Sequence, residues 1–148
     1  MKKLSIAVAI TLSSIVGSVY ADTQTVPVTA SIAGVCKFSG TIATVAFGLI
    51  DPSTTGTKTQ PLAFAYRCTK GTTASLSLGT ITPMAGATAP ADSIPFAVAA
   101  LPAGVLGTGF GTGSTATNVS VLVSILQADY QNVKADAYSG SVVVNIAP

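Results

Sequence analysis

The feature that most constrains the fold is a series of short segments in which every second residue is apolar, separated by Gly, Pro, Asp and Asn. A period of two is that of a β-strand with one buried face. Residues that favour helices are scarce, and Glu does not occur at all. The pattern therefore predicts an all-β domain, either a sandwich or a barrel.

Seven segments carry this pattern. In the clearest of them, Val119, Val121, Val123 and Ile125 share one face. Segment 94–100 is weaker, because Pro95 lacks the N–H that a ladder needs. The expected strands are residues 25–33, 42–48, 62–68, 74–79, 94–100, 119–126 and 137–147, with loops at 51–57, 83–93 and 101–118 and no amphipathic helix.

The first 21 residues have the three parts of a secretion signal: a basic start, an apolar run and a small residue at Ala21. The run is short and is interrupted by serines and a glycine, so a retained membrane anchor is the weaker interpretation. We expect cleavage after Ala21 and export of the remainder. That remainder is long enough for one domain with a real core, and too short for two.

Loss of the signal removes the net charge. The formal charge of +2 is supplied by Lys2 and Lys3, and the rest of the chain has five basic and five acidic residues. A neutral chain with few charges has no electrostatic reason to bind nucleic acid or anionic lipid. It also has little to keep its copies apart, which favours self-association.

The only two cysteines are Cys36 and Cys68. In an exported protein such a pair predicts one disulfide, which we expect to tie segment 25–33 to segment 62–68, and two free thiols are the weaker alternative.

Residues for catalysis or metal binding are largely absent. The chain has no His, so Ser-His-Asp and Cys-His sites cannot be built and a zinc site would lack ligands. Its Asp residues are scattered, as turn formers are. The Gly-rich stretch 107–113 lacks the Lys-Ser/Thr ending of a phosphate loop, so we expect a solvent-facing loop. We therefore expect neither an enzyme, nor a metal site, nor a small-molecule cofactor.

Several motifs together resemble one family. "VPVTASIAGVC", "VAFGLID", "LAFAYRCTKGTTASLSLG" and "DAYSGSVVVNIAP" are similar, in this order, to segments of the spore coat U-type pilins, the archaic, Csu-type subunits of chaperone–usher pili. The resemblance spans almost the whole mature chain. Residues 81–118 have no counterpart in it, and the ending Ala147–Pro148 departs from the family's frequent terminal aromatic residue.

The resemblance implies an immunoglobulin-like β-sandwich, incomplete because it lacks its last strand. Residues 34–148 would form this pilin domain, and the segment of a neighbouring subunit would complete it by β-strand addition. The donor would be residues 22–33, with Val26, Val28, Ala30 and Ile32 facing the groove. Acceptor residues on the last strand would be Val142, Val144 and Ile146. Pro27 is in tension with pairing on both sides.

The function implied by the resemblance is structural. The chain would be a subunit of a bacterial surface pilus, a fimbria that supports adhesion and biofilm formation. Its partners would be identical or related pilins in a head-to-tail filament, a periplasmic chaperone and an outer-membrane usher. It would pass through the periplasm to the cell surface.

Two other interpretations stay open at this point. One is a self-contained secreted β-sandwich, a coat or carbohydrate-binding protein in which residues 25–32 pair within their own chain. Tyr66, Tyr130 and Tyr138 would then be candidates for a sugar platform, although core packing is the expected role of such side chains. The other is a secreted enzyme, which would need acidic pairs that the sequence does not indicate.

Overall fold

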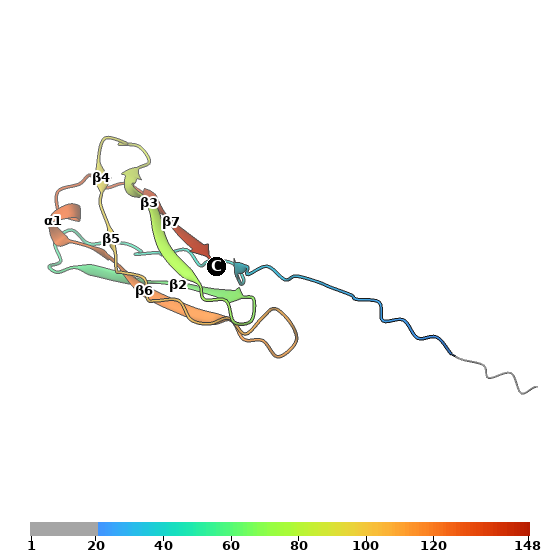
Figure 1. Ribbon diagram of the computed structural model, residues 1–148. Coiled ribbons are helices and arrows are strands. Elements are labelled where there is room, and N and C mark those ends of the chain that lie inside the picture. Colours follow the sequence, from blue (N-terminus) through green and yellow to red (C-terminus); the bar gives the residue numbers. More distant parts are fainter. Residues whose placement is uncertain (1–20) are drawn as a thin grey trace, which may run out of the picture. The chain divides into compact units, whose positions relative to one another are not determined.

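The computed structural model describes residues 21–148, in which seven strands and one short helix are formed (Figure 1). The expected signal peptide, residues 1–21, lies outside the described residues except for Ala21. The chain divides into two units, Met1–Ser31 and Ile32–Pro148, and all strands belong to the second.

The strands form two antiparallel sheets, which confirms the expected all-β class and is consistent with a β-sandwich. One sheet has the order β1-β2-β6-β5 and the other β4-β3-β7. Their bounds are β1 Cys36–Phe38, β2 Lys58–Cys68, β3 Ser75–Gly86, β4 Ser93–Ile94, β5 Ala97–Val98, β6 Thr117–Ile125 and β7 Tyr138–Ala147.

The core lies on the alternating apolar faces that the sequence predicts. Leu62, Phe64 and Tyr66 of β2 are buried, and so is every second residue of β6 from Val119 to Ile125. The inward residues of β3 and β7 pack against this core. Because each burial removes apolar surface from water, these two faces supply most of the driving force for folding.

The chain crosses between the sheets at Pro95. Ser93–Ile94 pairs with β3, whereas Ala97–Val98 pairs with β6. The expected single strand 94–100 is therefore wrong, and the missing N–H of Pro95 falls where no ladder is needed. The expected loop 83–93 is wrong in its first part, because β3 runs on to Gly86. The ladder has two register shifts, and the second, between Thr82 and Ala85, spans Pro83.

One short helix, α1 (Gln127–Tyr130), follows β6. It places Tyr130 in a second buried cluster with Ile94 and Ile125. The Tyr130 hydroxyl lies 2.7 Å from the Gly56 carbonyl oxygen and 3.0 Å from that of Thr54, so it fastens the loop before β2. No helix in residues 21–148 is long and apolar enough to cross a membrane.

At the opposite end of the strands, Cys36 and Cys68 form the expected disulfide. The bridge joins β1 to β2, and the two cysteines are ladder partners. The expectation that it ties segment 25–33 to β2 is wrong, because the strand that holds Cys36 begins at that residue.

The Gly-rich loop packs against this same end. The Gly107 amide donates to the Thr72 carbonyl, the Gly71 amide to the Gly107 carbonyl, and the Gly109 amide to the Cys68 carbonyl. A Cβ at Gly107 would collide with the backbone of Cys68, whereas one at Gly111 would meet open space. The expectation of a solvent-facing loop over 107–113 is therefore wrong at its start.

Replacing both cysteines by serine should lower the free energy of unfolding by about 3–4 kcal/mol, because the open chain regains loop entropy. The measurement is chemical denaturation of the Cys36→Ser/Cys68→Ser variant against the oxidised protein. Thiol labelling of the native protein should find no free cysteine, and two labelled thiols would contradict the bridge.

Gly107→Ala should cost about 1–3 kcal/mol, because the methyl group must displace the β2 backbone. Gly111→Ala is the matched control and should stay within about 0.5 kcal/mol of the parent. Thermal unfolding of the two variants compares them, and equal stabilities would show that the loop does not depend on this close approach.

Candidate functional site

The candidate site lies along the free edge of β7. In the order β4-β3-β7, this strand pairs with β3 on one side and with no described strand on the other. The other strands at sheet edges have only two or three residues, whereas β7 has ten. A long edge leaves a row of backbone N–H and C=O groups without ladder partners, which makes it a template for another strand.

The side chains of β7 alternate as the sequence predicts. Val142, Val144 and Ile146 are half-buried and pack against the core, whereas Val143 and Asn145 between them are exposed. The three expected acceptor residues therefore share the face that lies over the core.

Two adjoining hollows open beside β7. The larger, about 850 Å³, lies near Tyr138, and the smaller, about 240 Å³, reaches Val142. Both have residues of segment 42–52 on one side and core residues at their base. They share the lining residues Thr44, Val45, Phe47 and Met84, so we treat them as one groove between segment 42–52 and β7.

Segment 42–48 forms no strand, which corrects the sequence-based expectation (Figure 1). Its alternation is present, because Val45 and Phe47 are half-buried against the core while Thr44 and Ala46 are exposed. What it lacks is a ladder partner, since the groove separates it from β7. A strand needs a paired neighbour as well as an apolar face.

Charges lie at the Tyr138 end of the groove. Hydrogen bonds from the Thr88 amide, and then from the Ala137 amide and the Thr88 hydroxyl, hold the pKa of Asp136 below its usual value. The Ser53 hydroxyl and amide do the same for the pKa of Asp51. Partial burial raises the pKa of Tyr138, with smaller contributions from nearby carboxylates.

Segment 25–33, the expected donor strand, forms no strand in the structure. All its side chains are exposed; the exposed fractions are 74% for Val26, 91% for Val28 and 87% for Ile32. A single extended segment cannot satisfy its backbone groups by itself, so a strand here requires a second edge.

The tyrosines do not form a platform. Tyr66 and Tyr130 are 1% and 2% exposed, so the expected core role is confirmed for both. Within residues 21–148, no group of three or more His, Cys or Asp side chains could hold a metal ion. What the groove offers is an apolar base beside unpaired backbone groups, which suits an extended apolar segment.

The sequence did not identify the groove's base. Met84, Ile94 and Tyr130 line it, yet they come from a predicted loop, a strand interrupted by Pro95 and an unexpected helix. The walls are different, because Val45 and Phe47 lie within "VAFGLID" and Tyr138 and Val142 lie within "DAYSGSVVVNIAP", two of the segments on which the resemblance rests.

Comparison of the chain with protein-family models, with curated proteins and with solved structures finds no match. The resemblance to spore coat U-type pilins therefore rests on the motifs in the sequence, and the family assignment stays a prediction.

Stability should fall in acid through Asp51 and Asp136. Their folded-state pKa values lie below 3.8, the value for an unperturbed Asp, so their contribution is complete above that pH and is lost as the pH falls through the folded-state pKa. Asp136→Asn should flatten the dependence of the free energy of unfolding on pH below about pH 5. Denaturation at a series of pH values tests this.

Asp129→Asn is the control, because the Asp129 carboxylate has no hydrogen-bond partner among the residues that the structure describes. An Asp136→Asn curve parallel to that of the parent would contradict the prediction.

Proposed function

We propose that this chain is a structural subunit of a bacterial surface pilus, polymerised when the N-terminal segment of one copy enters the groove of the next. The observation that carries the proposal is the free ten-residue edge of β7, with an apolar groove beside its first half, from Tyr138 to Val142. The second support is a segment with alternating apolar residues, Val26, Val28, Ala30 and Ile32, that is exposed throughout.

In the proposed assembly the incoming strand satisfies both sides of the groove. Its backbone pairs with β7, and its apolar side chains lie over Val142, Val144 and Ile146. Segment 42–48 on the other side then gains the ladder partner that it lacks. This is β-strand addition, in which backbone hydrogen bonds supply affinity and alternate side chains supply specificity. The immunoglobulin-like sandwich would be complete only after insertion.

A contact of this kind joins two different surfaces, so it does not close on itself and builds a filament. An empty groove is also a hazard before assembly, because exposed apolar surface and free strand edges favour aggregation. A periplasmic chaperone would cover the groove first, and an outer-membrane usher would organise the exchange at the cell surface. Adhesion and biofilm formation would follow from display of the filament.

The competing interpretation, a self-contained sandwich, requires segment 25–32 to pair within its own chain. In residues 21–148 no ladder includes this segment. The two interpretations also differ in the purified material: strand donation gives heat-resistant polymers or a chaperone complex, and a self-contained sandwich gives monomers.

Val28→Asp should abolish donation, because a carboxylate buried in an apolar groove without a partner costs several kcal/mol. The same charge at Val144 should abolish acceptance and leave donation intact. Mixed in equal amounts, the two variants should give dimers that end there, seen as one heat-resistant band on electrophoresis. Thr29→Ser, next to Val28 on the opposite face, is the control and should polymerise like the parent.

Deletion of residues 22–30 separates the two interpretations. Under strand donation, the shortened chain keeps its fold and its groove, and it captures the segment of a full-length copy. Unfolding of the shortened chain would show that the segment pairs within its own domain, and the proposal would fail.

A further inference from the structure

The charged side chains of Ile32–Pro148 are segregated to the two ends of the strands. Lys37 and Arg67 are ladder partners beside the disulfide, and Lys70 lies in the turn that follows Cys68. No acidic side chain of Ile32–Pro148 lies at this end, which we call the disulfide end. Its side-chain charge is +3.

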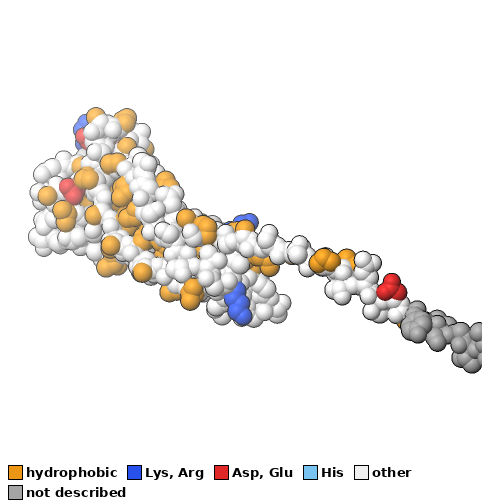
Figure 2. Space-filling model, in the orientation of Figure 1, with side chains coloured by type: hydrophobic (Ala, Val, Ile, Leu, Met, Phe, Trp, Pro, Cys, Tyr) orange, Lys and Arg blue, Asp and Glu red, His pale blue; other side chains and the backbone are white. Residues whose placement is uncertain are grey.

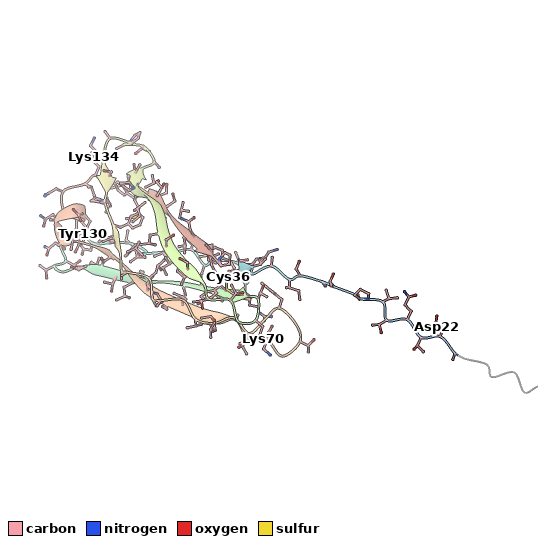
Figure 3. The ribbon with its side chains drawn as sticks, in the orientation of Figure 1. Asp22, Cys36, Lys70, Tyr130 and Lys134 are labelled. Carbon is pink, nitrogen blue, oxygen red and sulfur yellow. A yellow bond between two sulfur atoms is a disulfide. The ribbon has the colours of Figure 1, made fainter. Side chains whose placement is uncertain are left out.

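The opposite end, where Tyr130 and Lys134 lie (Figure 3), is called the Tyr130 end here and is acidic on balance. Asp51 and Asp136 line the large hollow there, Asp129 belongs to α1, and the Asp92 carbonyl accepts from Gly86 where β3 ends. These four carboxylates face two basic side chains, Lys58 and Lys134, which leaves a side-chain charge of −2. Figure 2 shows both red and blue side chains at this end, and blue without red at the disulfide end of Ile32–Pro148.

Both ends also expose apolar side chains. Val105, Leu106 and Phe110 are exposed on the loop that hydrogen-bonds to residues 68–72 at the disulfide end. At the Tyr130 end, Leu49 is fully exposed and Leu126 is more than half exposed. Opposite charges around apolar side chains are the features of complementary surfaces.

We propose that the disulfide end of one copy docks on the Tyr130 end of the next copy. The partner is a second copy of this chain because the two surfaces that complement each other in charge belong to the same molecule. The inference rests on the proposed function for the strand that links the copies, and it adds a second contact and a direction.

The direction follows from chain connectivity. Segment 26–32 leads into Cys36, so the body of a donating copy begins at its disulfide end. Every described ladder is antiparallel, so we take the donor strand to run antiparallel to β7. The C-terminal end of the donor strand then leaves the groove at Tyr138. The disulfide end of the donating copy therefore meets the Tyr130 end of the accepting copy. A parallel donor would bring two basic ends together. Charge therefore favours the antiparallel, head-to-tail arrangement.

The test makes the same Lys-to-Asp change once at each end of the domain, in two separate full-length variants. Lys70→Asp and Lys134→Asp change the net charge equally, and both lysines are exposed. At low salt Lys70→Asp should slow polymer formation about tenfold, because electrostatic steering between the two ends is weakened. Lys134→Asp makes the Tyr130 end more acidic, so it should not slow polymer formation. In 0.5 M NaCl the difference should vanish, since charges are then screened within a few ångströms.

Adding Asp129→Lys to Lys70→Asp brings the Tyr130 end to zero net side-chain charge, so the rate at low salt should not recover. Light scattering gives the rates, and electrophoresis of unheated samples identifies strand-linked polymers. If strand-linked polymers form and the two variants change the rate of their formation equally, the end contact is overturned and strand donation is unaffected.

The end contact also has a readout without strand donation. In full-length Val28→Asn, sedimentation velocity should detect weak, salt-sensitive self-association that Lys70→Asp reduces and Lys134→Asp does not. If no variant makes strand-linked polymers and this difference persists, the end contact stands and the proposed function fails. If sedimentation shows no salt-sensitive association, the end contact is overturned.

Discussion

The hydrogen-bonding groups on the free edge of β7 are the constraint on which the rest of the structure depends. Every strand must find partners for its backbone, and β7 has them on one side only. The groove beside it keeps segment 42–48 from becoming a strand, although Val45 and Phe47 already lie against the core. The outer edge of β7 and segment 42–48 are both without a ladder partner among the described residues, and in the proposed assembly a single incoming strand satisfies both.

At the disulfide end, by contrast, covalent and hydrogen bonds join the neighbouring segments. The bridge joins β1 to β2, the Val105 amide donates to the Tyr66 hydroxyl, and the loop at Gly107 is hydrogen-bonded to residues 68–72. Because the core is cross-linked at this end, it does not depend on a strand paired with the outer edge of β7. In the proposed assembly, the firm end is also the one from which the donor segment extends.

The sequence predicted those parts of the fold in which local pattern and final neighbours agree. β2 and β6 lie at the centre of a sheet, so their alternating faces are buried as the apolar period predicts. The pattern failed at segments 25–33 and 42–48, because periodicity reports a face that can be buried and says nothing of which edge will pair. It also missed Tyr130 and Met84 at the groove, whose neighbours come from distant parts of the chain.

The distribution of charge along the domain follows from the fold and cannot be read from the composition. Equal numbers of acidic and basic residues after the signal suggest a surface without electrostatic preference. The strands sort these residues by position along their length, so that Lys37, Arg67 and Lys70 meet at one end while Asp129 and Asp136 lie at the other. A chain can therefore be neutral and still be polar along its axis. For a subunit that repeats head to tail, this arrangement sets a side-chain charge of +3 on one copy against −2 on the next, so most of the charge at each proposed junction is offset.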